Sequence, residues 1–499
     1  TLKNIRSEKV IVPDESLLEL PEKVLQFGTG ILLRALPDYF IDKANRMGIF
    51  NGRVVIVKTT SRGDSTAFDK QDGLYTLCVR GVEDGQKVEE NIINSSISRV
   101  LHAQHEWRQI LECAHNQGLQ VIISNTTEVG IKLVNDDIRH HPPASYPGKL
   151  LAFLLERFNA FGGSRKSGFV IVPTELIPDN GRKLESIVLE LAHLNGLEDD
   201  FIEWLEGCNY FCNSLVDRIV TGMPDEEIKS TIENELGYKD ELMTICEVYR
   251  LWAIEGDDHV KKILSFAVAD DGMIIKPDID LYRELKMRVL NGTHTMTCGI
   301  AFLAGFDTVK QAMDDEMMEG YMSDLMQQEI GPSIPYDTGP EEVRLFIAKV
   351  LDRFRNPHLN HHWKNITLNY TSKIKMRCIP LLVNYYKNNN AVPELIALGF
   401  ASYLFFMKAV KQSGKEFYGE FNDNNYLIED EMAPKFYKLW QDLPVVELVE
   451  AVLKNTIFWG EDLTVLEGFQ QSVSEKLNSI IKEGMKATIN SVHPKKIFV

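Results

Sequence analysis

The pattern of hydrophobic and polar positions changes partway along the chain. In the first half, short runs rich in β-branched residues alternate with segments whose apolar residues recur every three or four positions. The runs predict buried parallel strands, and the periodic segments predict helices that cover them. We expect strands at 24–27, 53–59, 119–124 and 168–172, and helices at 31–44, 105–116, 149–158 and 182–193. This alternation indicates an α/β fold with a doubly wound parallel sheet.

From about residue 280 the pattern becomes helical, with few strands. Helices are expected at 281–304, 308–329, 341–354, 362–377, 392–411, 433–441, 445–454 and 465–488. The longest apolar run, Leu395 to Met407, is too short to span a bilayer and predicts a buried helix. We therefore predict two domains, an α/β domain over 1–277 and a mainly α-helical domain over 278–499.

A glycine turn, Gly28-Thr29-Gly30, stands between the first strand and the first helix. The free amides and the helix dipole at such a junction favour a phosphate. The third glycine of the usual dinucleotide fingerprint is missing, and Leu33 stands in its place, so a simple turn is the alternative. The residues predicted to contact a dinucleotide here are Phe27, Gly28, Thr29, Gly30, Ile31 and Leu32.

Two further polar segments follow predicted strands, where ligands of open α/β sheets bind. An acidic residue after the second strand would hold the adenosine ribose, and Asp64 is the nearest candidate. Arg62 leaves room for a 2′-phosphate, so the choice between NAD and NADP stays open. After the strand at 119–124 we predict cofactor contacts from Asn125, Thr126 and Glu128, with a helix cap as the alternative.

The net charge of -18 argues against nonspecific binding to nucleic acid or to an anionic membrane. An anionic substrate therefore needs a local cluster of Lys and Arg. Seven scattered cysteines without a CxxC pair predict reduced thiols, and the N-terminus shows no apolar secretory segment. We expect a cytoplasmic protein; its oligomeric state is not evident from the sequence.

The stretch from Lys286 to His294 places an amine, a carboxamide and an imidazole within nine residues. On an α-helix Asn291 and His294 would lie about 60° apart, and Lys286 about 140° from Asn291. Taken alone, the stretch also fits a core helix with an exposed lysine and a buried histidine.

Three histidines, His358, His361 and His362, raise the question of a metal. No Cys or acidic ligand stands at a suitable spacing beside them, so we interpret them as polar helix residues and predict no metal site.

Several motifs, in order and spacing, cover most of the chain. They are Gly28-Thr-Gly30 with Arg34-Ala35, Gln71-Asp-Gly-Leu-Tyr75, Asn213 before Val216-Asp-Arg-Ile219, the K-x4-N-x2-H pattern at Lys286, Asn291 and His294, and Arg353-Phe-Arg-Asn-Pro357. In these motifs the chain resembles the long-chain polyol dehydrogenase family, which includes the mannitol dehydrogenases. The resemblance implies a Rossmann-type N-terminal domain, a helical C-terminal domain, NAD as cofactor and no metal.

The same resemblance implies a role for each matching residue. Lys286 would be the general acid and base, Asn213 and Asn291 would polarise the reacting oxygen, and His294 and Lys373 would contact the substrate. Segments 124–131, 145–150 and 217–222 look most like family members that interconvert a keto-sugar acid and an aldonate.

Such a substrate carries a carboxylate, for which Arg283, Lys373 and Arg377 are the candidate ligands; a solvated helix face is the alternative for each. The alternatives for the whole chain are a sister enzyme with another sugar acid or a polyol as substrate, and a dinucleotide-binding regulator without turnover.

Overall fold

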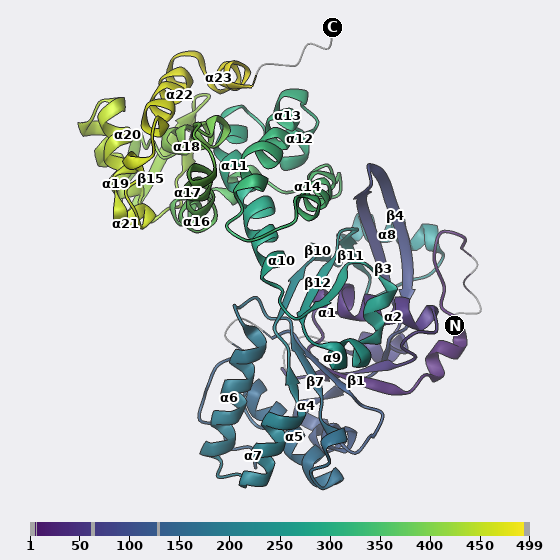
Figure 1. Cartoon of the computed structure of the whole chain (residues 1–499). Helices are drawn as coiled ribbons and strands as arrows, with labels where there is room; N and C mark the ends of the chain where they lie inside the picture. Colours follow the sequence, from purple (N-terminus) through teal and green to yellow (C-terminus); the bar gives the residue numbers. More distant parts are fainter. Residues whose placement is uncertain (1–4, 6, 61–64, 127–129, 494–499) are drawn as a thin grey trace. The chain divides into compact units, whose positions relative to one another are not determined.

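The computed structural model describes residues 5, 7–60, 65–126 and 130–493. The chain forms two compact units, one of residues 1–80 and 87–279 and the other of residues 81–86 and 280–499 (Figure 1). Each unit is described by itself.

The first unit is built on a six-stranded sheet in the order β5-β2-β1-β6-β7-β8, and every pairing in it is parallel. Its strands are β1 Glu22–Phe27, β2 Arg53–Lys58, β5 Ile97–His102, β6 Val121–Ser124, β7 Val170–Pro173 and β8 Tyr210–Phe211. The strand order reverses between β1 and β6, which is where ligands of such sheets bind. The predicted doubly wound α/β fold is confirmed.

Both faces of this sheet are covered, which explains why its strands β2, β6 and β7 are buried along their whole length without alternation. Leu25 and Phe27 of β1 belong to the core on one face, and Val24 belongs to the core on the other. Helices α4 Ala103–Cys113, α5 Tyr146–Phe161, α6 Asn180–Leu194 and α7 Asp199–Cys208 pack on the first face, and α1 Ile31–Ala35 and α2 Pro37–Arg46 on the second (Figure 1).

Two smaller sheets of the first unit were not predicted. One has the order β10-β11-β3-β4 and the other β13-β12-β9. Their strands are β3 Tyr75–Glu83, β4 Gln86–Asn94, β9 Ser214–Asp217, β10 Val220–Gly222, β11 Thr244–Glu247, β12 Leu251–Glu255 and β13 Met273–Lys276, and helices α3 Thr66–Lys70, α8 Glu226–Leu236 and α9 Asp258–Ile263 accompany them. Most of β4 is exposed or half-buried and rich in charge, so it lacks the apolar run that marks a buried strand.

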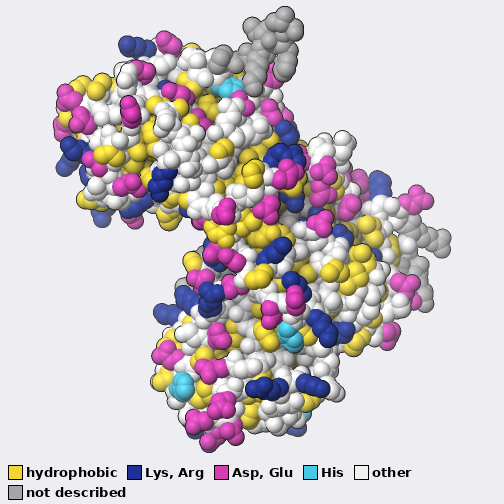
Figure 2. Space-filling model, viewed as in Figure 1, with side chains coloured by type: hydrophobic (Ala, Val, Ile, Leu, Met, Phe, Trp, Pro, Cys, Tyr) yellow, Lys and Arg dark blue, Asp and Glu magenta, His cyan; other side chains and the backbone are white. Residues whose placement is uncertain are grey.

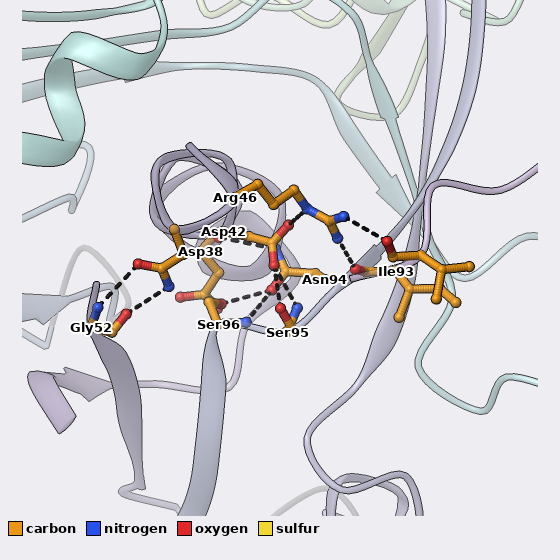
Figure 3. Close-up of polar contacts among 10 residues, drawn as sticks. Asp38, Asp42, Arg46, Gly52, Ile93, Asn94, Ser95 and Ser96 are labelled. Atoms are coloured by element: carbon orange, nitrogen blue, oxygen red, sulfur yellow. Dashed lines mark hydrogen bonds and ion pairs between the residues drawn. The ribbon is translucent and has the colours of Figure 1, made fainter. Parts of the chain in front are cut away.

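Helix α2 is held by buried polar groups (Figure 3). The Asp42 carboxylate accepts hydrogen bonds from the backbone N–H and hydroxyl of Ser95, both at 2.7 Å, and from Nε of Arg46 at 2.7 Å. Asp38 lies one turn earlier and is fully buried; its Oδ2 accepts a hydrogen bond from the Gln26 amide at 3.3 Å. Its Oδ1 has no hydrogen-bond partner in the described part of the chain. The two aspartates therefore differ in how well their charge is compensated.

The second unit is mainly α-helical, as predicted. Its described helices are α10 Asp280–Leu285, η5 Lys286–Gly292, α11 Thr293–Leu303, α12 Val309–Met313, α13 Glu316–Asp324, η6 Leu325–Ile330, η7 Gly331–Ser333, α14 Pro340–Phe354, α15 Trp363–Ile366, α16 Tyr370–Arg377, α17 Ile379–Asn388, α18 Glu394–Phe406, α19 Ala433–Asp442, α20 Val445–Leu453, α21 Thr456–Trp459, η8 Leu463–Val465, α22 Phe469–Glu483 and α23 Met485–Val492. The expected apolar helix is α18, whose side chains are mostly buried against α11 and α22.

Several expectations for this unit were wrong in detail. Each of the segments 308–329, 362–377 and 465–488 is divided into separate helices. The segment 281–304 is not one α-helix, because residues 286–292 form a π-helix between α10 and α11. The segment 392–411 ends as a helix at Phe406, and a small antiparallel sheet follows with strands β14 Lys411–Ser413, β15 Glu416–Phe421 and β16 Asn424–Leu427. Gly414 and Gly419 allow this sheet its turn and its close packing.

None of the described helices combines the length and apolar character needed to cross a bilayer. On the face drawn in Figure 2, the basic side chains of the described residues are interspersed with acidic ones.

Candidate functional site

A cavity of about 550 Å³ lies in the first unit at the carboxyl ends of β1, β2 and β6. Gly28, Thr29 and Gly30 line one side, and Asn125 and Thr126 line another. Half of the ten predicted cofactor residues therefore meet in one pocket. Of the others, Phe27 is buried in the sheet core, Ile31 and Leu32 begin α1, and Asp64 and Glu128 lie outside the described residues.

The glycine at the edge of this pocket stands in a left-handed backbone conformation and leaves little room for a side chain. Gly28 has φ +128°, and a Cβ added to it would lie 3.0 Å from Cδ1 of Leu33 and 3.1 Å from the carbonyl oxygen of Asn125. The backbone after β1 and the backbone after β6 thus approach each other closely. Leu33, which replaces the third glycine of the fingerprint, packs against this turn from within α1.

Lysine rather than an acid stands at the end of β2. Lys58 is buried and lines the pocket together with Lys132 and Lys149, and no Asp or Glu is among the described lining residues. Lys149 donates hydrogen bonds to the carbonyls of Pro143 and Ala144 at 2.6 and 2.8 Å, so it stabilises the turn before α5. The sequence pattern of β2 could have indicated Lys58, because it is the last residue of that strand.

Asn213 lies beyond β8 and is buried. Its Oδ1 accepts hydrogen bonds from the backbone N–H groups of Gly181 and Arg182 at 3.0 and 3.2 Å, which caps the N-terminus of α6. Its Nδ2 donates to Oε2 of Glu255 at 3.0 Å. The two backbone donors fix the orientation of the amide, so the second hydrogen on Nδ2 is the group with which Asn213 can donate a hydrogen bond to a ligand.

In the second unit, the π-helix η5 changes the geometry expected for Lys286 and Asn291. An α-helix places residues four apart on one face, whereas the i→i+5 hydrogen bonds of a π-helix bring residues five apart onto nearly the same face. Lys286 and Asn291 are five apart and are the first and sixth residues of η5. The expected separation of about 140° was therefore wrong, because it assumed α-helical geometry.

Arg288 connects η5 to α16. Its Nε donates to Glu284 at 2.9 Å, and its Nη1 donates to the backbone carbonyls of Met376 and Arg377 at 2.6 and 3.0 Å. These are carbonyls at the C-terminus of α16, which a cation stabilises. The contact holds the end of α16, with its basic residues, beside η5.

His294 is buried at the start of α11, in an aromatic pocket. Its ring stacks on Phe354 with 4.3 Å between centroids and meets the edges of His361 and Trp363 at 5.0 and 6.0 Å. Its Nε2 has no hydrogen-bond partner among the residues that the structure describes. Burial, reinforced by neighbouring positive charges, holds the pKa of His294 well below its usual value, so the imidazole is neutral at pH 7.

The positive charges that remain at pH 7 are those of Arg353, Lys373 and Arg377, because burial and nearby cations also lower the pKa of the neighbouring His361. Arg353 directly precedes Phe354 on α14, and Lys373 and Arg377 are one turn apart on α16. Nη1 of Arg377 donates to the hydroxyl of Thr295 at 3.1 Å, and Nζ of Lys373 donates to the carbonyl of Ile366 at 2.8 Å. We call Arg353, Lys373 and Arg377 the basic cluster.

Arg353 was not predicted as a site residue, although its motif was noted. Arg283, which was predicted, forms an ion pair with Asp280 at 2.5 Å at the start of α10. An arginine with an adjacent carboxylate has less positive field to offer an anionic ligand.

The interpretation of the three histidines as helix residues was wrong. His358 and His361 lie between α14 and α15, where Pro357 and the turn at Asn356 interrupt the helix, and His362 precedes α15 at its N-cap position without a side-chain cap hydrogen bond. Across the described ranges, no group of three His, Cys, Asp or Glu side chains has the arrangement of a metal site.

A larger cavity, of about 1060 Å³, lies in the second unit along α14, from Pro340 to Leu351, and the end of α17. Size alone would make it the first choice for a ligand. None of the predicted site residues lines it, and neither do the residues of the basic cluster, so we base no function on it.

Comparison with known proteins agrees with this description. The sequence pattern of the Mannitol dehydrogenase Rossmann domain matches residues 22–266, and that of the Mannitol dehydrogenase C-terminal domain matches residues 278–481. The chain belongs to the mannitol dehydrogenase family and is a dehydrogenase that acts on the CH–OH group of a polyol or sugar acid.

Among its relatives are two enzymes named altronate oxidoreductase. The one from Halalkalibacterium halodurans is 36% identical over 95% of this chain and 94% of its own length, and the one from Bacillus subtilis is 37% identical over 94% and 95%. A solved structure of Pseudomonas fluorescens mannitol 2-dehydrogenase with NAD and D-mannitol shares the fold, with a TM-score of 0.64 and 21% identity over 99% of this chain and 98% of that one. A D-sorbitol dehydrogenase has a TM-score of 0.76 at 19% identity, over 98% and 99% of the two chains.

Proposed function

We propose that the protein interconverts tagaturonate, a keto-sugar acid, and altronate, its aldonate, with NADH and NAD as the redox pair. The observation that carries the proposal is the basic cluster of Arg353, Lys373 and Arg377 around the neutral His294. A substrate carboxylate binds well to such a cluster, whereas a neutral polyol gains little from it. The altronate oxidoreductase relatives, 36% and 37% identical to this chain, support the same substrate class.

The pocket beside Gly28 fits a dinucleotide. Its glycine turn opens α1, and Gly28 combines a positive φ with little space for a Cβ, as expected where a backbone must approach a pyrophosphate. We assign NAD, which the solved mannitol 2-dehydrogenase binds. Lys58 at the end of β2 makes a comparison of NADH with NADPH the necessary control, because a cation there favours a 2′-phosphate.

When bound, the nicotinamide would supply or accept the hydride. Lys286 is assigned the proton: it protonates the oxygen of the reacting carbon during reduction and removes that proton during oxidation. Asn291 donates a hydrogen bond to the same oxygen, where negative charge grows, and Asn213 is assigned the same role through its second amide hydrogen. Neutral amides suit this task because they lose no proton.

The remaining residues bind and orient the substrate. Nε2 of His294, which is buried and unpartnered among the described residues, would bond a hydroxyl beside the reacting carbon. Because the imidazole is neutral at pH 7, it adds no charge to the basic cluster. The cluster is assigned the carboxylate, and no step is assigned to a metal, so activity is expected to survive extensive chelation.

The proposal is tested by NADH oxidation with tagaturonate, fructuronate and fructose as substrates. We expect tagaturonate to give the highest kcat/KM, and Lys286→Ala to lower kcat by at least about a thousandfold while NADH still binds. Preference for fructuronate or fructose would assign the chain to a sister enzyme of the family. NADH binding without any turnover would favour a regulator instead, and unchanged activity of Lys286→Ala would refute the mechanism.

A further inference from the structure

Glu175 lies between β7 and α6, and its carboxylate holds the loop that follows β6. Oε1 accepts hydrogen bonds from the backbone N–H and the hydroxyl of Thr126 at 2.7 and 3.0 Å. Oε2 accepts a hydrogen bond from the hydroxyl of Ser124 at 3.2 Å. Only 2% of Glu175 is exposed, so three donors from one short loop converge on a buried carboxylate. Buried carboxylates are costly, and such a group persists where its hydrogen bonds compensate the charge.

The loop that Glu175 holds is one wall of the dinucleotide pocket. Asn125 and Thr126 line the pocket, whereas Glu175 itself does not. The carbonyl oxygen of Asn125 is the atom that lies 3.1 Å from the position of a Cβ on Gly28. A small shift of this loop toward Gly28 would therefore narrow the gap between the two walls.

The other side of Glu175 is fixed to the sheet. The side chain of Asn180 donates hydrogen bonds to the carbonyls of Glu175 at 3.0 Å and of Pro173 at 3.1 Å. The Oδ1 of Asn180 accepts the backbone N–H of Ser214, next to Asn213, at 2.9 Å. Asn180 therefore fixes the backbone of Glu175 relative to β7 and β9, and the carboxylate of Glu175 in turn holds the pocket loop.

We propose that Glu175 is a positioning residue for the dinucleotide, and that its carboxylate holds the Ser124–Thr126 loop at the distance from Gly28 that the cofactor requires. It contacts the loop and is not assigned any step of the reaction. The inference rests on the proposed function only in taking NADH as the ligand of this pocket.

The test is the variant Glu175→Gln, which keeps the shape of the side chain. One carboxylate oxygen becomes an NH2 group, which cannot accept hydrogen bonds, so the three donors of Ser124 and Thr126 cannot all be satisfied. Loss of one charge-assisted hydrogen bond predicts a Kd for NADH that is about tenfold higher. The KM for NADH should rise by a similar factor, and kcat at saturating NADH should stay within about threefold, because no reacting group has changed.

The matched control is Glu329→Gln in the second unit. Glu329 is also buried, with 7% of its surface exposed, and accepts backbone N–H groups of Leu395 and Ile396 at 2.9 and 2.7 Å. This variant should lose thermal stability and keep the wild-type Kd for NADH. A merely structural Glu175 would behave in the same way, with a lower Tm and an unchanged Kd.

A second variant keeps the test decisive if Glu175→Gln does not fold. Ser124→Ala removes the bond to Oε2 and leaves both bonds from Thr126, so it should raise the Kd for NADH about threefold, as expected for a weaker, single hydrogen bond. NADH is titrated by its fluorescence against each purified full chain. Wild-type affinity in the folded Glu175 variant, or in Ser124→Ala where only that variant folds, overturns the inference. Failure of the wild type to bind NADH would instead overturn the proposed function.

Discussion

Replacing Asp38 by Asn should stabilise the protein, and more so as the pH rises. Asp38 is fully buried on α2, and burial raises the pKa of its carboxyl to about 7, against the small opposing effects of the Gln26 hydrogen bond and of Arg34. Figure 3 shows it beside Asp42, whose negative charge adds to the shift. At high pH the folded chain must therefore hold a poorly compensated negative charge that the unfolded chain hydrates freely.

The sign follows from proton linkage. The folded state binds the Asp38 proton more tightly than the unfolded state, whose pKa is 3.8, so stability falls as the pH rises from about 4 to about 7 and is level above that. Each pKa unit corresponds to about 1.4 kcal/mol, which gives a penalty of about 4 kcal/mol at pH 8 and about 2 kcal/mol at pH 5. Asn carries no charge and avoids the penalty at both values.

The measurement is the thermal midpoint of wild type and variant at pH 5 and pH 8. At about 2–4 °C per kcal/mol for a unit of this size, Asp38→Asn should gain roughly 8–16 °C at pH 8 and about half as much at pH 5. Asp42→Asn, one turn along α2, is the control and should destabilise, because its carboxylate accepts hydrogen bonds from Ser95 and Arg46. A gain for Asp38→Asn that is equal at the two pH values would refute the reasoning.

Two further variants probe the proposed site. Gly28→Ala should lose about 1–3 kcal/mol of stability and bind NADH more weakly, because its Cβ would contact Leu33 and Asn125 in a backbone conformation with positive φ. Gly30→Ala is the control: Gly30 has φ −62° and open space around the position of a Cβ, so this variant should keep the wild-type Tm. Arg377→Ala should raise KM for tagaturonate at least about tenfold and hardly change KM for fructose, whereas Arg283→Ala, already paired with Asp280, should change neither by more than about threefold. Steady-state kinetics with both substrates would contradict this assignment if Arg283→Ala had the larger effect on tagaturonate.

Four strands of the parallel sheet, β1, β2, β6 and β7, could be predicted because they are largely buried and read as apolar runs. The edge strands β5 and β8 are partly exposed and were not among the predicted strands. The glycine turn could be placed for a related reason, since it lies between a buried strand and a helix. The smaller sheets escaped prediction because strands such as β4 face solvent along much of their length and carry charged residues that suit a loop equally well. The local pattern of apolar residues thus predicts strands that are buried on both faces, and it misses strands whose burial depends on a partner distant in the sequence.

Prediction of the site residues has the same limit, because the local sequence does not reveal contacts with distant residues. Gly28 and Thr126 follow buried strands, and the topology alone brings them to one edge of the sheet. Glu175 follows a strand too, but its importance depends on three donors from another loop, which no spacing along the chain reveals. Arg353 is 59 residues from His294 in sequence, and only the packing of Phe354 on the imidazole brings the two together.

The π-helix explains why a five-residue spacing between Lys286 and Asn291 is compatible with a shared task. On a regular α-helix these side chains would diverge, and one of them would have to reach around the helix. The hydroxyl of Thr295 on α11 donates a hydrogen bond to the carbonyl of Asn291 at 2.8 Å, so a side chain of the following helix also contacts the end of η5. Arg288, within η5, ties it to the C-terminus of α16 and so to Arg377. The π-helix therefore connects two parts of the proposed site. Its seven residues carry Lys286, which is assigned the proton, and through Arg288 they hold the end of α16, which carries Arg377, assigned the carboxylate.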